Sequence, residues 1–425
     1  MRVLFVSANR EEINMRTWPL GMACVAQATA TAGHDVKLID LLLEANPRSA
    51  LEQAVYQFRP QVVGISVRNI DDQSMENTLF LLDQVKEAVS YCRAFSDAPI
   101  VLGGAGYSMF PESCLEYLDA DMGIQGEGES AFPTLLERLE QGAELSGVPG
   151  LYLSDRGRQA DRIFESKLDK FPLPDVAMLS PSSADDPDFW LPVQTRRGCP
   201  MNCSYCSTAT IEGCLIRKRS PSEVVQWLSR CVRAGFRRFF FVDNTFNLPP
   251  SYAGSLCSAI VAADLGIIWR CILYPVRIDE GLIKKMAAAG CREVSLGFES
   301  GSDLVLHGMN KRFTPQEVRI VSGLLVNHGI MRMGFLLLGG PGETEETVLQ
   351  SLEFADSLNL DALKVSLGIR IYPHTALAQR AIRDGIVAAQ DRLLLPRFYL
   401  SPELDLERLR QTVSRWAATR PNWLV

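Results

Sequence analysis

One segment of this 425-residue chain is more informative than any other: Arg196-Arg-Gly-Cys199-Pro-Met-Asn-Cys203-Ser-Tyr-Cys206. Its cysteines have the spacing C-x3-C-x2-C and directly follow a predicted strand over residues 191–195. Three close thiolates can bind three irons of a [4Fe–4S] cluster and leave the fourth iron open for another ligand. The spacing therefore predicts that Cys199, Cys203 and Cys206 hold such a cluster. A zinc site is the alternative; it requires a fourth ligand, for which Cys214 is available without a second C-x2-C pair or a nearby histidine.

The region around this segment shows a repeated strand and helix pattern. Between residues 191 and 385, short β-branched or aromatic runs alternate about six times with amphipathic helical stretches. Such alternation is typical of a parallel sheet with crossover helices, and six units are enough for a partial (β/α)6 barrel. Residues 386–425 are expected to form a loop, a short helix and a tail.

The cysteine segment resembles the cluster motif of the radical SAM superfamily, in which an aromatic residue, here Tyr205, precedes the last cysteine. The resemblance implies that the open iron binds the amino and carboxylate groups of S-adenosylmethionine (SAM), which one electron cleaves to a 5′-deoxyadenosyl radical. Three later segments are similar to SAM-contacting strands of that family. The residues implied are Asp243 and Asn244 near the methionyl amine, Glu299 and Ser300 near the ribose, and Leu338 along the adenine.

Each later segment also has a simpler interpretation. Glu299 could be an acid at a helix N-terminus, Pro341-Gly342 a plain turn and Asp243 a surface carboxylate. Their order and spacing after the cysteines favour the family interpretation.

The first third of the chain has a second alternating pattern. Between residues 2 and 141, apolar runs alternate with amphipathic helical stretches, which predicts a doubly wound parallel sheet, Rossmann-like, in a domain over residues 1–145. Residues 146–190 are rich in Gly, Pro, Ser and Asp, including 180–187, and are predicted to be a linker. Ligands of such sheets bind beyond the carboxyl ends of the strands.

The predicted strand ends of this domain look like those of the cobalamin-binding domain that is fused to a large radical SAM subgroup. Small residues there let the backbone approach a flat macrocycle, as glycines do at dinucleotide sites. By this resemblance, the chain's cobalamin contacts are Leu20, Gly21, Ser66, Arg68, Asn69, Gly103, Gly104, Ala105, Gly126, Glu127, Gly128 and Glu129. A surface salt bridge is the alternative role for Arg68. His34 lacks the Asp-x-His-x-x-Gly context of a cobalt ligand, so we do not expect it to bind cobalt.

Composition limits the cellular setting. The formal net charge of -7 disfavours nucleic acid, and no apolar run has the length of a membrane span, so we expect a cytoplasmic protein. Most other cysteines fall within helical or strand patterns and are predicted to be core residues. Cys271, on a predicted barrel strand, is a candidate hydrogen donor lining the cavity, and Tyr274, Arg277, Arg370, Tyr372 and His374 are candidate substrate contacts at strand ends.

Together the two resemblances imply an enzyme that uses SAM twice: once to methylate cobalamin, and once to form the radical that activates the substrate. The expected substrate is a small molecule or natural-product intermediate, methylated at an unactivated carbon, and the expected electron donor is a flavodoxin or ferredoxin. Two alternatives remain open. One is non-methylating radical chemistry, such as cyclisation, ring contraction or rearrangement, and the other is a radical SAM enzyme whose N-terminal domain does not use cobalamin.

Overall fold

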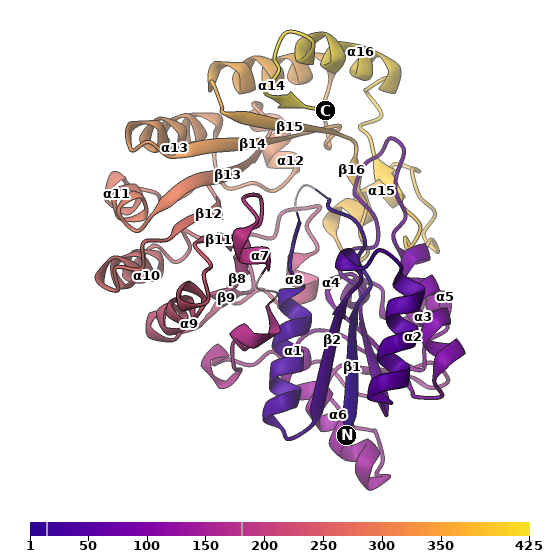
Figure 1. The fold of residues 1–425 in the computed structure, drawn as a ribbon. Coiled ribbons are helices and arrows are strands. Elements are labelled where there is room, and N and C mark those ends of the chain that lie inside the picture. The colour runs from indigo at the N-terminus through magenta and orange to yellow at the C-terminus, as the bar shows by residue number, and fades with distance from the viewer. Residues whose placement is uncertain (14–15, 180–181) are drawn as a thin grey trace. The chain divides into compact units, whose positions relative to one another are not determined.

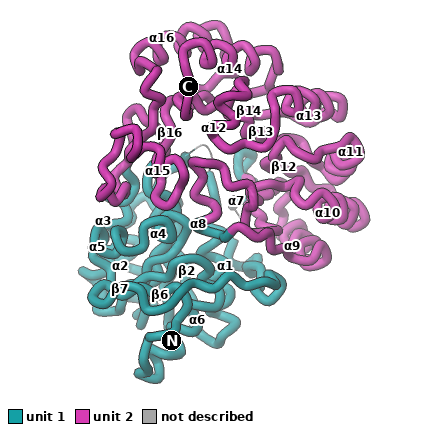
Figure 2. The backbone as a smooth tube through the Cα atoms, turned by 180° about the vertical axis from the view of Figure 1, so that it is seen from behind, with its two compact units in different colours: residues 1–72, 79–189, 210–213 teal, residues 73–78, 190–209, 214–425 magenta. Residues whose placement is uncertain are grey.

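The structure, a computed structural model, describes residues 1–13, 16–179 and 182–425. The chain forms two compact units, coloured separately in Figure 2. Unit 1 comprises residues 1–72, 79–189 and 210–213, and unit 2 comprises residues 73–78, 190–209 and 214–425. In the described part of the chain, no helix combines the length and apolar composition needed to cross a membrane.

Unit 1 is built on a seven-stranded sheet with the order β2-β1-β3-β4-β5-β6-β7. The first five strands in this order are parallel, and β6 and β7 are antiparallel additions at one edge. Helices α1 and α6 cover one face, and α2 and α3 cover the other (Figure 1). The strands are β1 (Arg2–Ser7), β2 (Asp35–Asp40), β3 (Val62–Ser66), β4 (Ile100–Gly103), β5 (Met122–Ile124), β6 (Leu151–Leu153) and β7 (Gly157–Arg158). The helices are α1 (Leu20–Thr31), α2 (Pro47–Phe58), α3 (Leu82–Phe95), α4 (Ala105–Met109), α5 (Pro111–Leu118), α6 (Gly128–Gln141) and α7 (Ser182–Asp185).

The predicted doubly wound domain is confirmed, and its strands read as continuous apolar runs because helices cover both faces of the sheet. The segment predicted as a linker differs in part. Its residues Leu151–Leu153 and Gly157–Arg158 form a hairpin that extends the sheet beyond β5. The hairpin supplies backbone partners to a short strand that would otherwise be a bare edge. Residues 180–181 of the predicted linker lie outside the described residues.

Unit 2 is built on a second seven-stranded sheet, entirely parallel, with the order β18-β15-β14-β13-β12-β11-β8. Helices α9, α10, α11, α13 and α14 lie along the outer face of its strands (Figure 1). The strands are β8 (Leu191–Val193), β11 (Arg238–Phe241), β12 (Ile268–Leu273), β13 (Cys291–Glu299), β14 (Met331–Leu338), β15 (Ala362–Leu367) and β18 (Trp423–Leu424). The helices are α8 (Thr208–Glu212, which is partly in unit 1), α9 (Pro221–Arg233), α10 (Pro250–Ala262), α11 (Glu280–Ala288), α12 (Asp303–Gly308), α13 (Pro315–Asn327), α14 (Glu345–Ser357), α15 (Ala376–Arg383) and α16 (Leu406–Ala417).

The barrel strands alternate between buried and half-buried residues, as β12 does over its whole length. The buried set faces the helices: Phe241 and Trp269 pack edge to face, and the Trp269 indole donates to the carbonyl of Ala289 at the end of α11. The half-buried set therefore faces the inner side of the sheet. This alternation fixes which residues of each strand can meet a ligand.

The C-terminal tail joins the barrel sheet. Trp423 and Leu424 form β18, which pairs in parallel with β15 and adds a strand after the six that the sequence predicted. Two contacts hold the tail: the Trp416 and Trp423 rings stack with centroids 6.0 Å apart, and Arg420 binds both carboxylate oxygens of Asp356 at 2.6 and 2.9 Å. The strand is two residues long, which is too short for a pattern to reveal.

Candidate active site

The three predicted cluster ligands lie in one loop of unit 2. β9 (Arg196–Arg197) and β10 (Arg217–Lys218) form a small antiparallel pair, and the loop that begins after β9 carries Cys199, Cys203 and Cys206. All three are partly accessible and form no disulfide, and the Cys206 thiol lies 3.2 Å from the hydroxyl of Thr208. The loop starts at the carboxyl end of the β8 segment, where parallel sheets place their ligand sites.

Hydrogen bonds that involve no thiol hold this loop in place. The Ser204 amide donates to the Met309 carbonyl at 2.9 Å, and the Ser204 carbonyl accepts from the Leu377 amide at 2.8 Å. The side chain of Asn310 donates to the carbonyl of Asn202 at 2.6 Å. The loop is thus fixed from two sides, by the segment after α12 and by the start of α15, and its cysteines remain available as ligands.

This arrangement fits an iron–sulfur cluster. In the described part of the chain, no three His, Cys, Asp or Glu side chains form a group that could hold a single metal ion. A [4Fe–4S] cluster has a different requirement, because each thiolate binds its own iron and the cysteine sulfur atoms therefore lie further apart than the ligands of a single ion. Three cysteines without disulfides, on a loop that the protein's own hydrogen bonds hold in place, fit such a cluster.

Tyr205 and Glu299, both predicted from the family resemblance, meet beside the cysteines. The Tyr205 hydroxyl donates to Oε1 of Glu299 at 3.0 Å, and the ammonium of Lys311 lies 3.2 Å from the same oxygen. Glu299 has a φ of +63° next to a register shift between β13 and β14, so its backbone adopts a conformation that is uncommon outside glycine. These contacts turn its carboxylate toward the cysteine loop.

Lys311 is a site residue that the sequence analysis missed. Its side chain is 5% exposed, and burial alone would lower its pKa, but Tyr205, Glu299 and Cys203 raise the pKa well above its ordinary value. The lysine is therefore charged at neutral pH. Its signal in the sequence is weak, since a lysine after a helix is normally a surface residue.

The hydroxyl of Ser300, a predicted ribose contact, forms hydrogen bonds within the protein. Ser300 is fully buried, and its hydroxyl lies 2.8 Å from the Ser351 hydroxyl and accepts from the Ser302 amide at 3.1 Å. The Ser351 hydroxyl also accepts from the Gly301 amide at 3.0 Å. In this conformation Ser300 shapes the turn after Glu299.

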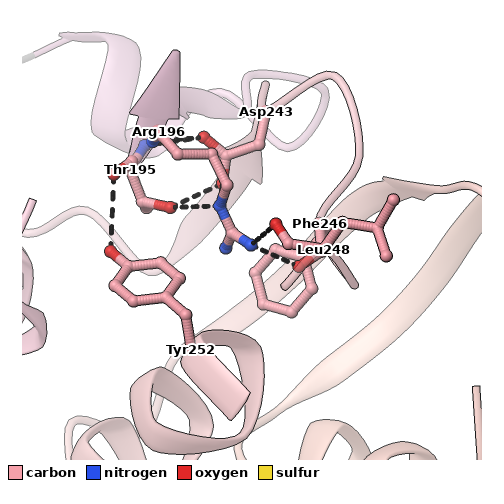
Figure 3. A network of polar contacts seen from close by, with 6 residues as sticks. All are labelled: Thr195, Arg196, Asp243, Phe246, Leu248 and Tyr252. Carbon is pink, nitrogen blue, oxygen red and sulfur yellow. Dashed lines mark hydrogen bonds and ion pairs between the residues drawn. The ribbon is translucent and has the colours of Figure 1, made fainter. Parts of the chain in front are cut away.

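Asp243 is likewise built into a buried network (Figure 3). One carboxylate oxygen accepts from the Thr195 and Arg196 amides at 2.7 and 3.0 Å, and the other accepts from the Thr195 hydroxyl at 2.6 Å. Arg196 Nε lies 3.1 Å from that second oxygen, and Arg196 Nη1 donates to the carbonyls of Phe246 and Leu248. Asp243 is fully buried and is a positioning residue for the chain that enters the cysteine loop.

Two further predicted contacts lie at neighbouring strand ends. Asn244 is half-buried after β11, with Oδ1 3.5 Å from the Thr208 hydroxyl. Leu338 is buried at the end of β14, and the amides of Gly339 and Gly340 that follow both donate to Oε2 of Glu343. Glu343 is fully buried, and burial raises its pKa to about 7 although these amides lower it. Glu343 therefore holds the turn that follows Leu338 at the end of β14.

In unit 1, the carboxyl ends of β1, β2 and β3 bring charged and polar groups together. Asp40 ends β2, accepts a hydrogen bond from the Leu42 amide and interacts with the Ser7 hydroxyl at the end of β1. Burial raises the pKa of Asp40, and Ser7 and Arg68 partly offset this. Burial also lowers the pKa of Arg68, and the charge of Asp40 partly offsets this. Asp40 was not predicted as a site residue.

The glycines of the same edge provide a test of whether cobalamin fits. A Cβ atom on Gly21 or Gly103 would have no atom within 4 Å, and neither residue has a positive φ. Neither packing nor conformation requires glycine there, so both keep space open beside the strand ends. Gly104 differs: its φ is +102° and a Cβ would lie 2.6 Å from the Val67 carbonyl oxygen, so the fold itself requires glycine. The open positions fit a broad flat ligand.

The remaining predicted contacts of unit 1 occupy the starts of helices and strand ends. Leu20 and Ala105 begin α1 and α4, Ser66 ends β3, and Asn69 is half-buried beyond it. Gly126 has a φ of +93°, and a Cβ on Gly128 would lie 2.8 Å from Val25. Glu127 and Glu129 are both buried, and Glu127 accepts from the Glu165 amide at 2.9 Å.

Three further side chains considered in the sequence analysis have contacts within the protein. Cys271 is fully buried on the helix side of β12 beside Cys291 and Cys257, so its proposed place in the cavity was wrong. The alternating pattern predicted the strand correctly, but it did not show which face of the strand carries Cys271. Arg370 is buried, with its guanidinium on the carbonyls of Ile371, Leu393 and Leu394. The Nδ1 atom of His34 lies 2.9 Å from the Met1 amino group, at the end of the sheet where β1 and β2 begin.

A parallel half-barrel with a three-cysteine loop at the carboxyl edge of its strands defines an iron–sulfur enzyme of the radical SAM class. The chain also carries an α/β unit with open glycine positions at its strand ends. Comparisons with known proteins agree: the Radical SAM superfamily model matches residues 193–355, and the B12 binding domain model matches residues 6–136. The chain thus combines a radical SAM domain with a B12-binding domain.

Relatives cover most of the chain. An uncharacterized methyltransferase of Pyrococcus horikoshii is 29% identical over 91% of this chain and 84% of its own length. Tryptophan 2-C-methyltransferase of Streptomyces laurentii is 23% identical over 89% of this chain and 74% of its own.

A structure of the radical SAM methyltransferase TsrM from Kitasatospora setae, with cobalamin and a [4Fe–4S] cluster bound, matches 100% of this chain and 92% of its own, with a TM-score of 0.89 and 21% identity. A second TsrM structure contains tryptophan substrate and a SAM analogue, with a TM-score of 0.87, 23% identity and coverage of 98% of this chain and 89% of its own. At such identity the likeness establishes the fold, which resembles that of these methyltransferases.

Proposed function

We propose that this protein is a cobalamin-dependent radical SAM methyltransferase that acts on an unactivated carbon of a small organic molecule. One observation carries the proposal: a single chain combines a loop of three cysteines, held in place by hydrogen bonds and without disulfides, with a B12-binding domain whose Gly21 and Gly103 keep space open at the strand ends. The methyltransferase relatives support methyl transfer as the outcome.

The side chains have distinct tasks in this proposal. Cys199, Cys203 and Cys206 hold a [4Fe–4S] cluster, SAM binds beside it, and cobalamin binds at the strand ends of unit 1. When bound, these groups supply one-electron cleavage of SAM and carriage of a methyl group. Glu299 is oriented by Tyr205 and Lys311, and Glu343 holds the turn after Leu338. Asp243 and Arg196 keep the entry to the cysteine loop in position.

The proposal includes partners and a compartment. An electron donor such as a flavodoxin or ferredoxin would deliver the electron, and no nucleic acid takes part, in keeping with a net charge of -7. We place the enzyme in the cytoplasm, because reduced thiols persist in a reducing compartment.

Methyl transfer can be tested without knowing the substrate. The reconstituted enzyme is reduced anaerobically with cobalamin and SAM labelled with deuterium in its methyl group, and the products are analysed by mass spectrometry. We expect one S-adenosylhomocysteine for each label that enters the cobalamin fraction. Release of 5′-deoxyadenosine with no label in cobalamin would contradict the proposal and favour cyclisation, ring contraction or rearrangement instead.

A matched pair of variants controls for non-enzymatic methylation. Gly103→Leu fills a position with no neighbour within 4 Å and should abolish labelling, whereas Gly323→Ala, at an open helical position in unit 2, should not change it. Equal labelling in both variants and in free cobalamin would contradict an enzymatic reaction at this site.

A further inference from the structure

A buried cation stands beside the cysteine loop. Lys311 follows α12, its side chain is 5% exposed, and its ammonium lies 3.2 Å from Oε1 of Glu299. The ammonium also lies 5.2 Å from the ring centroid of Tyr205, the residue between Cys203 and Cys206. A lysine this deeply buried is rare unless it is paired, so its position requires an explanation.

The segment that carries Lys311 is fastened to the loop at two other points. The Met309 carbonyl accepts from the Ser204 amide at 2.9 Å, and the Asn310 side chain donates to the Asn202 carbonyl at 2.6 Å. Three consecutive residues therefore contact the cysteine loop or its Glu299 neighbour. The charge of Lys311 is held at a fixed place relative to the thiols, and does not move freely as it would on a surface lysine.

The charges around this site are unbalanced without Lys311. The cluster requires three thiolates, and the carboxylate of Glu299, 12% exposed, adds a further negative charge nearby. Charges interact strongly where water is largely excluded. The ammonium of Lys311 lies over the ring of Tyr205, which stands between Cys203 and Cys206, so its charge is placed beside the loop as well as beside Glu299.

From these contacts, and on the basis of the proposed cluster, we infer that Lys311 is a positioning residue that balances the charge of the cluster loop and favours one-electron reduction of the cluster. An added electron increases the negative charge of the site, and a fixed cation nearby stabilises it. Glu299 acts in the opposite direction through its own charge. The pair thus sets the reduction potential through two groups that need not bind iron.

The test measures the reduction potential and not turnover. Wild type, Lys311→Met, Lys311→Arg, Glu299→Gln and the double variant Lys311→Met/Glu299→Gln are reconstituted with iron and sulfide. Each is titrated with dithionite under electron paramagnetic resonance, with iron content and circular dichroism recorded in parallel. In this titration one electron passes from the reductant to each cluster, and no bond forms or breaks. Lys284→Met, at an exposed position on α11, is the matched control.

We expect Lys311→Met to weaken reduction at least tenfold, which is about 59 mV for a one-electron couple. Lys311→Arg and Lys284→Met should remain near wild type. Glu299→Gln should shift the potential in the opposite direction, and the double variant should return toward wild type. If Lys311→Met cannot retain its cluster, the double variant should regain iron, because the uncompensated carboxylate has been removed.

Three results would overturn the inference: an unchanged potential in Lys311→Met, shifts of the same sign in both single variants, or a double variant that lacks iron although wild type holds it. A wild-type protein that binds no iron would instead overturn the proposed function, so the two failures are distinguishable.

Discussion

Arg196, three residues before the first cluster cysteine, forms a buried ion pair with Asp243, with Arg196 Nε 3.1 Å from Oδ2 of Asp243. The guanidinium also lies over the rings of Phe246 and Tyr252, at 5.0 and 4.5 Å from their centroids. Both side chains are almost fully shielded from water, so each charge needs the opposite charge of the other to offset the cost of burial. The entry to the cysteine loop is therefore anchored by electrostatics within unit 2.

Asp243→Ala should destabilise unit 2 by about 3–5 kcal/mol, because it leaves the Arg196 charge buried without its partner. Denaturant unfolding of the apoprotein measures this change. Asp243→Asn keeps the shape and should lower iron loading and stability together. Weaker SAM binding with unchanged stability and iron content would contradict the positioning role and restore Asp243 as a contact of the methionyl amine.

Cysteine substitutions should separate ligand thiols from core thiols. Cys203→Ala should lose the absorption of the [4Fe–4S] cluster while keeping the fold, since Cys203 lies in a loop and makes no disulfide. Cys271→Ala should keep its iron and lose about 1–2 kcal/mol of stability, because Cys271 is fully buried among other thiols. Equal iron content in both variants would contradict the assignment of the ligands.

Adjacent glycines in unit 1 should respond in opposite ways. Gly103→Leu enters open space and should weaken cobalamin binding, measured by equilibrium dialysis, with little change in stability. Gly104→Ala should destabilise the unit by more than 1 kcal/mol, because a Cβ would meet the Val67 carbonyl and φ is positive. Undiminished cobalamin binding by Gly103→Leu would remove this edge from the candidate site.

The stability of unit 2 should depend on pH through Glu343. Burial raises its pKa from 4.5 to about 7, so the folded state binds its proton more tightly than the unfolded chain does. The stabilisation is fully present below about pH 4.5 and is lost as the pH rises through 7, by about 3 kcal/mol at 1.36 kcal/mol for each pKa unit. Glu343→Gln should lack this slope in denaturant unfolding between pH 5 and 8. The same slope in both proteins would exclude Glu343 as its source.

The sequence predicted the features that are local along the chain. The cysteine loop, the alternating strands and the glycines at strand ends each lie within about ten residues, so spacing and composition reveal them. Asp40 and Arg68 escape such reasoning, because they approach one another only through the strand order β2-β1-β3. Lys311 meets Tyr205 across more than a hundred residues and has no periodic signal.

Two corrections concern contacts between elements that are distant along the chain. Period-two alternation places Cys271 on one face of β12 but does not say which face is inward, and packing against α10 decides it. The hairpin of β6 and β7 and the two-residue β18 arise because sheet edges take up available backbone partners. Such additions depend on where the edges lie, which sequence patterns do not record.

Metal content tests the central claim most directly. The purified protein is reconstituted anaerobically with iron, sulfide and hydroxocobalamin, desalted, and assayed for iron, cobalt and absorption spectrum. A cluster-bearing, cobalamin-binding enzyme predicts about four irons and one cobalt per chain, with cobalt lost in Gly103→Leu and iron lost in Cys203→Ala. Iron without cobalt would contradict the cobalamin assignment of unit 1, and cobalt without iron would contradict radical SAM chemistry in unit 2.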